Sequence, residues 1–323
     1  MQCACRLIPI SFALFASLPA LAGESDLAEA KPVPDVQVLP LPHDEASFVH
    51  LGRELTRFHF ASTLQRPFLY PLVGPAGVSY TRMGHPHDPV SHSHHNSVWI
   101  SHQSVGGASF WEDRTPARII CERVEQYEDG PKQAWLLAVN AWQASDGKTV
   151  LVERRRVAVE PLEAGQWRMA IDLELRSPVG RPVTLGETGF GIIGVRMAKT
   201  IGVLDGGGRI LDSEGRLGEA EIFRQPSRWV DYSGPVTRDA TGGITLMDHP
   251  GNPNHPAPFH VRGDGWMGAC LTLSGPLVIE PQEPLRLRYG LWVHAGVPAR
   301  QAVEPLWKAF AEEPLPSMER QPR

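Results

Sequence analysis

Alternation of apolar and polar residues with a period of two runs through most of this chain and constrains its fold more than any other feature. The segment WRMAIDLELR (167–176) is the clearest case, with charged residues at several of the intervening positions. Its apolar residues on one face are Trp167, Met169, Ile171, Leu173 and Leu175. Successive side chains of a β-strand point to opposite faces, so this segment is expected to be a half-buried antiparallel strand.

The same period recurs in the segments 133–143, 149–160, 244–248 and 285–294, and glycine and proline separate the segments. A helical pattern is found only near the C-terminus, between residues 303 and 312. Its apolar stripe consists of Val303, Leu306, Trp307 and Phe310. Many strands with almost no helix predict an all-β protein, a large antiparallel β-sandwich with a short C-terminal helix.

The N-terminus resembles an export signal. Arg6 precedes an apolar run, and Ala20-Leu21-Ala22 has the small-x-small pattern of a cleavage site. We expect residues 1–22 to be a signal peptide, 23–45 a loosely ordered arm and 46–323 a single domain. The apolar run is shorter than the ~20 residues that span a bilayer. The mature protein is therefore expected to be periplasmic or secreted and not to span a membrane.

Charge and cysteine content limit the possible partners. The net charge is −5 and no basic block occurs, so a nucleic-acid partner is not expected. Cys3 and Cys5 leave with the signal peptide, whereas Cys121 and Cys270 remain, either as a disulfide or as two free thiols. The sequence does not indicate an oligomeric state.

Histidines are concentrated in HPHDPVSHSHHNSVWISH (85–102), which holds six of the thirteen in the chain. The prolines predict a loop at the start of this stretch, followed by a strand that carries Trp99. If His92 and His94 were extended, they would share a face about 7 Å apart, and His95 would face the other way unless the loop turns. His102 would lie about 26 Å beyond His94 and take no part in the same site.

Three interpretations of this histidine patch remain open. Imidazoles at such density suit a divalent metal, with His92, His94 and His95 as candidate ligands. They also suit acid–base catalysis, because imidazole titrates near neutrality. The third interpretation is a polar loop whose histidines bond only to the backbone.

A second polar island, DHPGNPNHPAPFHVRGDGW (248–266), contains four prolines that stiffen a loop. Its candidate side chains are Asp248, His249, His255, His260 and Arg262. Between the two islands, SRWVDYSG (227–234) places an aromatic ring beside charged groups, as in many sugar sites. Its candidates are Arg228, Trp229, Asp231 and Tyr232, and Trp99 and Trp111 are further candidate sugar-stacking rings. Glu187 is a candidate catalytic carboxylate, and His294 is a weaker candidate.

Several motifs together resemble the exported bacterial family known as PmoA-like, also labelled "methane oxygenase PmoA". They include RPFLYPLVGPAG, SHSHHNSVW, GGASFW, RWVDYSG and LRLRYGLWVHAG, and they extend from about Arg66 to His294. The family is of unestablished function and is similar to the galactose-mutarotase-like β-supersandwich group, whose members bind or process carbohydrates. Its genes tend to occur among polysaccharide-degradation genes. The resemblance therefore implies that fold and a saccharide ligand, and the lack of a spanning segment argues against the oxygenase label.

Two motifs depart from the family pattern. The usual Asp-His-Pro-His-His-Arg is Ser91-His92-Ser93-His94-His95-Asn96 here, which keeps the histidines but loses the acid and the arginine. The usual Asn-Gly-x-Asp-Phe-Trp is GGASFW, which ends in Trp111 and lacks both polar side chains. A changed substrate would account for both departures.

These observations predict a carbohydrate-active enzyme that uses histidine and carboxylate groups for acid–base chemistry, as a hydrolase, lyase or epimerase. Both islands would line one pocket. His92, His94, His95, Asp248, His249 and Glu187 are the catalytic candidates, and the remaining candidates would bind the sugar. The alternatives are a non-catalytic carbohydrate-binding protein and a metal-dependent enzyme.

Overall fold

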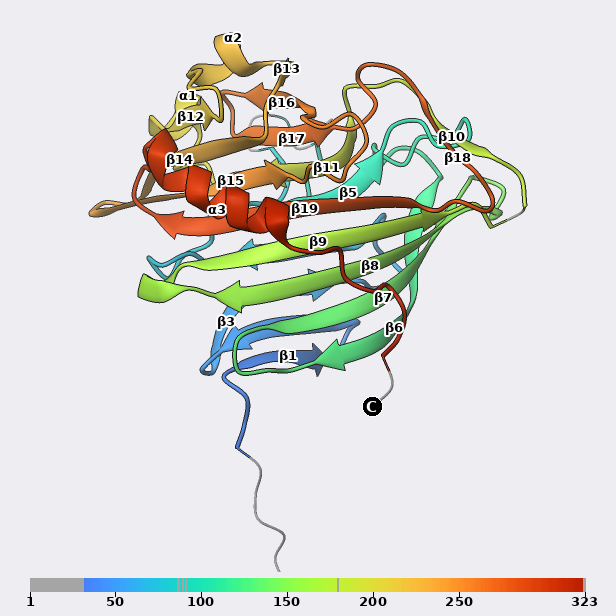
Figure 1. The fold of residues 1–323 in the computed structure, drawn as a ribbon, viewed down its shortest axis with the longest axis horizontal. Coiled ribbons are helices and arrows are strands. Elements are labelled where there is room, and N and C mark those ends of the chain that lie inside the picture. The colour runs from blue at the N-terminus through green and yellow to red at the C-terminus, as the bar shows by residue number, and fades with distance from the viewer. Residues whose placement is uncertain (1–31, 86–87, 89, 91, 179, 322–323) are drawn as a thin grey trace, which may run out of the picture. The chain divides into compact units, whose positions relative to one another are not determined.

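Two large antiparallel sheets face each other across one apolar core in the computed structural model (Figure 1). The structure describes residues 32–85, 88, 90, 92–178 and 180–321. Residues 34–323 form one compact unit. The all-β antiparallel sandwich with a short C-terminal helix, expected from the alternation, is confirmed.

The first sheet has nine strands, and their spatial order does not follow the chain order. In spatial order they are β1 (Val36–Leu41), β2 (Glu45–His50), β3 (Arg53–His59), β4 (Phe68–Leu72), β5 (Val98–His102), β11 (Gly191–Arg196), β17 (Trp266–Cys270), β16 (Pro258–Arg262) and β13 (Gln225–Pro226).

The second sheet has eight strands, and a separate pair forms a small two-stranded sheet. The eight, in spatial order, are β12 (Arg209–Asp212), β14 (Trp229–Thr237), β15 (Ala240–Asp248), β19 (Leu285–Ala295), β9 (Trp167–Arg176), β8 (Thr149–Pro161), β7 (Ala134–Gln143) and β6 (Arg118–Glu128). The pair consists of β10 (Val183–Leu185) and β18 (Leu277–Ile279). The helices are α1 (Val203–Gly206), α2 (Gly218–Ile222), α3 (Arg300–Glu312) and a 3₁₀ turn (Glu163–Gly165).

The alternation that predicted the strands also assigns their faces. All five apolar residues singled out in β9 are buried in the core, between 0 and 1% exposed. Burying them removes a large apolar area from water, which is the main stabilising contribution to such a sandwich.

Helix α3 lies across the outer face of the eight-stranded sheet, the face that points away from the core (Figure 1). Val303 and Phe310 pack there against Trp229, Met247 and Trp292. The apolar stripe expected for this segment is confirmed, and it forms a second, smaller apolar cluster outside the main core.

The N-terminal arm requires a correction. Residues 36–41 form β1, which pairs along its whole length with β2, so this part of the predicted arm belongs to the sheet. Val36 and Val38 are buried, and the alternation in VQVLPL was hidden by its proline and short length. The predicted signal peptide, residues 1–22, lies outside the described residues. Cys121 and Cys270 are free thiols.

The packing of α3 gives a prediction about stability. Phe310→Ala removes a ring that is 4% exposed, so we expect it to lower the free energy of unfolding by about 3–5 kcal/mol. The measurement is urea unfolding followed by circular dichroism. Gln301→Ala, at an exposed position of the same helix, is the control and should change stability little. Equal unfolding midpoints for the two variants would contradict this role of α3.

Candidate functional site

A pocket of about 470 Å³ opens on the outer face of the nine-stranded sheet. The face is identified by alternation, because Val98 and Ile100 of β5 point into the core while Trp99 between them points outward. The pocket is lined by His92, His94, His95, Gln103, Trp111, Glu112, Phe190, Leu204, Glu219, His260, Arg262, Asp264 and Trp266. Both histidine-rich islands therefore contribute to it.

A glycine in β11 makes room for the base of this pocket. Gly194 pairs with Trp99 of β5 on one side and with Gly268 of β17 on the other. A Cβ atom at Gly194 would lie 2.5 Å from Cζ2 of Trp99, far inside van der Waals contact. The Trp99 ring can lie against the sheet only because residue 194 has no side chain.

Aromatic rings stack above that glycine to form the floor. His95 stacks on Trp99 with ring centroids 5.4 Å apart, and on Trp266 with centroids 6.1 Å apart. Trp111 and Phe190 join the same cluster, with a centroid distance of 5.8 Å between them. Trp99 is 1% exposed and does not line the pocket, so it supports the floor and is not placed to touch a ligand.

The histidine patch adopts a turn, in which the backbone N–H of His95 donates to the carbonyl of His92. The turn brings all three rings together, with centroids 5.9 Å apart for His92 and His94, 5.0 Å for His92 and His95, and 4.5 Å for His94 and His95. The residues are therefore not in the extended arrangement considered from the sequence. They form a turn, and the turn places His95 beside His92 and His94. His102 lies apart and interacts with Thr272 (Nε2 to Oγ1, 2.9 Å).

One buried guanidinium joins this turn to the loop that carries Trp111. Arg66 is 1% exposed and donates to Oδ1 of Asn96 (2.7 Å), to Oδ1 of Asp113 (2.9 Å) and to the Trp111 carbonyl (2.9 Å). It also contacts the carbonyl of His94 at 3.4 Å. These bonds fix the two loops relative to each other on opposite sides of one cation.

Two of the lining histidines are held in the neutral form. Burial lowers the pKa of His260 to about 4 and lowers the pKa of His95 further, with the neighbouring imidazole of His94 adding to the effect. Nδ1 of His260 donates to the carbonyl of Gly189 (3.2 Å), which leaves Nε2 as the unprotonated nitrogen of the neutral ring. His260 also lies edge-on to Trp266, with centroids 3.9 Å apart. Its ring is therefore oriented as a proton acceptor.

Asp264 forms an ionised wall of the pocket. Burial opposes the charge of this carboxylate, but the Arg196 guanidinium, 2.8 Å away, and His85, 2.9 Å away, outweigh burial and lower its pKa. Arg196 is fully buried and lies behind Asp264, outside the lining.

Arg262 and Glu219 form an ion pair at the rim. Nη1 of Arg262 lies 2.7 Å from Oε1 of Glu219, while Oε2 of the same carboxylate accepts from the backbone N–H of Gly263. The guanidinium also lies over the Phe223 ring, 4.6 Å from its centroid. These contacts hold the Arg262 head group at the pocket edge.

The metal alternative lacks a ligand set in the described part of the chain. Within residues 32–85, 88, 90, 92–178 and 180–321, no three His, Cys, Asp or Glu side chains are grouped so as to hold a metal ion. His87 of the same loop lies outside these residues. His92, His94 and His95 thus cluster without forming a three-histidine coordination site by themselves.

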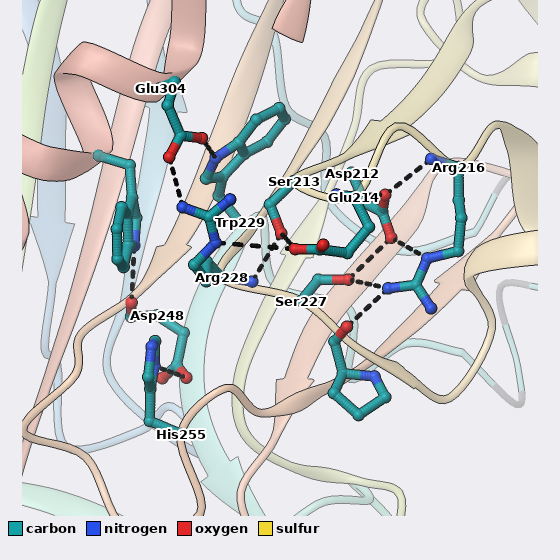
Figure 2. Close-up of polar contacts among 12 residues, drawn as sticks. Asp212, Ser213, Glu214, Arg216, Ser227, Arg228, Trp229, Asp248, His255 and Glu304 are labelled. Atoms are coloured by element: carbon teal, nitrogen blue, oxygen red, sulfur yellow. Dashed lines mark hydrogen bonds and ion pairs between the residues drawn. The ribbon is translucent and has the colours of Figure 1, made fainter.

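Other candidates from the second island lie elsewhere and have structural contacts. Asp248 is buried and accepts from His255 (Nδ1, 2.7 Å), from the Asn252 amide and from a backbone N–H, which closes the proline-rich loop on itself. Its carbonyl accepts from Nε1 of Trp307 in α3. Figure 2 shows Asp248 and His255 beside this contact. The expected convergence of the whole island on one pocket is therefore wrong for this pair.

The segment between the islands also packs away from the pocket. Arg228 forms an ion pair with Glu304 of α3, and Trp229 lies beside the same carboxylate (Figure 2). The Arg228 guanidinium covers the Trp307 ring, 4.7 Å from its centroid. These two residues anchor α3 to the sheet and are not placed to bind a sugar in the pocket.

The remaining candidates are accounted for in the same way. Asp231 and His294 form a buried pair (Oδ2 to Nε2, 2.8 Å), and the Tyr232 hydroxyl donates to carbonyls of residues 262 and 263. His249 lies edge-on to Phe310 under α3. Glu187 is exposed and does not line the pocket.

Sequence reasoning did not single out Gln103, Glu112, Phe190, Leu204 or Glu219 as site residues. Glu112 directly follows the candidate ring Trp111, and this adjacency could have identified Glu112 from the sequence. Phe190 and Glu219 carry no such signal, because pairing of distant strands and the short helix α2 bring them to the pocket.

The neutral histidines predict how stability depends on pH. Burial lowers the pKa of His260 and of His102 to about 4, whereas an unfolded histidine titrates near 6.5. Between these values the unfolded chain binds protons that the folded chain does not, so the free energy of unfolding falls as the pH is lowered from 6.5 towards 4.

Urea unfolding at a series of pH values measures this slope. His260→Gln should reduce the slope by up to about 1.4 kcal/mol per pH unit, the contribution of one proton. A slope that is identical in the variant and the parent would show that His260 titrates normally in the folded protein.

Comparison with known proteins provides a family assignment. No curated protein sequence matches the chain. Among solved structures, it is similar to a heparan sulfate lyase HepC mutant from Pedobacter heparinus, with 9% identity and a TM-score of 0.39. The match covers 85% of this chain but only 39% of the lyase. A polysaccharide lyase matches with 11% identity and a TM-score of 0.35, over 83% of this chain and 34% of the other. The sequence pattern of a family of unknown function, DUF6807, matches residues 45–308, and the chain therefore belongs to that family.

Proposed function

We propose that this protein is an exported carbohydrate-active enzyme that binds a saccharide in the pocket on the nine-stranded sheet and moves protons on it. The observation that carries the proposal is the combination of an aromatic floor with oriented histidine and carboxylate side chains in one pocket of about 470 Å³. Pockets of this size, mostly apolar with a few directed polar groups, are typical of small-molecule sites.

The floor suits the apolar face of a sugar ring. Trp111, Phe190 and Trp266 present ring surface to the pocket, and Gln103, Glu112 and Asp264 supply polar atoms around it. A sugar presents C–H groups on one face and hydroxyls at its edge, so rings below and hydrogen-bonding groups at the sides match both.

The histidines suit proton transfer in two complementary roles. His260 is neutral, with Nε2 unprotonated, and serves as the proton acceptor. Nδ1 of His92 lies 3.1 Å from Oδ2 of Asp88, so this carboxylate orients the ring, and His92 serves as the partner of His260 in proton transfer. Hydrolysis, elimination and epimerisation of sugars all require such a pair.

The resemblance to the PmoA-like family supports a saccharide ligand, and the predicted signal peptide supports export. In the described residues, no helix is long and apolar enough to cross a membrane. Each of these points is compatible with an exported enzyme that acts on carbohydrate.

Saccharide binding should depend on the ring of Trp111. Removing one stacked ring should weaken sugar binding by roughly tenfold or more, since such contacts contribute about 1–3 kcal/mol in comparable stacking platforms. Intrinsic tryptophan fluorescence during titration with oligosaccharides measures affinity. Trp111→Phe should retain most of the binding that Trp111→Ala loses. Trp307→Ala, outside the pocket, is the matched control, and equal losses in both alanine variants would contradict the assigned floor.

Turnover should depend on His260 and not on His255. His260→Gln should lower kcat by about 10²–10⁴-fold, the usual contribution of a proton-transfer group, with little change in KM. His255→Gln is the matched control, because His255 lies on the same island but bonds to Asp248 outside the pocket. Release of product from polysaccharide digests is the measurement. Binding without turnover in the parent protein would identify a carbohydrate-binding protein instead of an enzyme.

A further inference from the structure

We infer that the pocket accepts an uncharged saccharide and discriminates against uronic acids and sulfated sugars. This inference rests on the saccharide function proposed above and specifies its substrate class. It follows from the charges that line the pocket and from how each of them is already compensated.

Among the described residues that line the pocket, no lysine or arginine lacks an ion-pair partner. Among its lining residues in the described part of the chain, Arg262 is the single Lys or Arg, and it is paired with Glu219 at 2.7 Å. Residues 86, 87, 89 and 91, outside the described residues, are Pro, His, Pro and Ser, so the histidine loop adds neither type there. Recognition of a carboxylate or sulfate normally uses a free Arg or Lys.

The buried imidazoles do not replace such a cation. Burial lowers the pKa of both His95 and His260, and of His85 behind the wall, so these rings are uncharged near neutral pH. Neutral imidazoles accept or donate single hydrogen bonds, which suits hydroxyl groups.

Carboxylates contribute negative charge on the same surface. Glu112 is exposed at the rim and, within the residues that the structure describes, forms no ion pair. Asp264 lies between the pocket and Arg196, so it shields the ligand from that buried guanidinium. An anionic sugar would meet like charge at Glu112, and two unit charges about 4 Å apart interact by about 1–4 kcal/mol at dielectric constants between those of water and a protein surface.

The charge pattern also bears on the reaction. Elimination from a uronic acid builds negative charge on the sugar carboxylate and needs a cation or several donors to stabilise it. Arg262, the one Arg or Lys among the described residues that line the pocket, is paired to Glu219 and is not free for that purpose. Hydrolysis or epimerisation of a neutral sugar places no such demand on the site.

Matched pairs of oligosaccharides test this inference. Neutral tetrasaccharides of glucose, galactose, mannose and xylose are compared with their uronic acid or sulfated counterparts by tryptophan fluorescence titration at low and at physiological salt. We expect the anionic member of a bound pair to bind roughly fivefold to tenfold more weakly at low salt, with a smaller difference at higher salt because repulsion is screened.

Two variants identify the source of the discrimination. Glu112→Gln should reduce the ratio of the affinities for the neutral and the anionic sugar by a few fold. Glu122→Gln, on β6 of the other sheet, should leave this ratio unchanged. Anionic sugars that bind as tightly as neutral ones would overturn the inference but not the proposed function, and so would an unchanged difference in Glu112→Gln. Failure of every sugar in both series to bind would overturn the proposed function as well.

Discussion

The candidate site depends on one buried cation, the Arg66 guanidinium. It stands between the histidine turn and the loop of Trp111 and donates to acceptors on both sides, including Asn96 and Asp113. Leaving these acceptors without a donor inside the protein would cost the full desolvation of several polar groups. The described parts of these two loops lie outside the sheets. The exposed contact from Arg114 to the Val90 carbonyl also joins them, but Arg66 is the buried side chain that bonds to both.

Burial then determines the chemistry that the held groups can perform. Stacking between tryptophan rings removes His95 from water, and contact with Trp266 does the same for His260, so both favour the neutral ring. Asp264 is only partly buried and stays ionised, because Arg196 compensates its charge. The two histidines are thus neutral and Asp264 is charged in the same pocket, because the carboxylate has a countercharge beside it.

The sequence predicts the fold more fully than the site, for physical reasons. Alternation in β9 reports burial directly, and so does the stripe of α3, because each residue's environment follows from its position in the element. The type of a side chain does not show where the fold places it. His260 and His255 belong to the same proline-rich island, yet one lines the pocket and the other closes a turn on Asp248. Phe190 was not foreseen, because its place is set by strands that are distant in the chain.

The order of strands in the nine-stranded sheet has a consequence for how ligand binding and folding are linked. Neighbouring strands β5, β11 and β17 begin at residues 98, 191 and 266, so the pocket floor exists only after very distant segments have paired. No fragment shorter than residues 98–270 contains all three strands. Any ligand of this pocket would therefore bind only the completed sandwich. Its binding would stabilise the whole domain against unfolding, by an amount that rises with the logarithm of the free ligand concentration once this exceeds the dissociation constant.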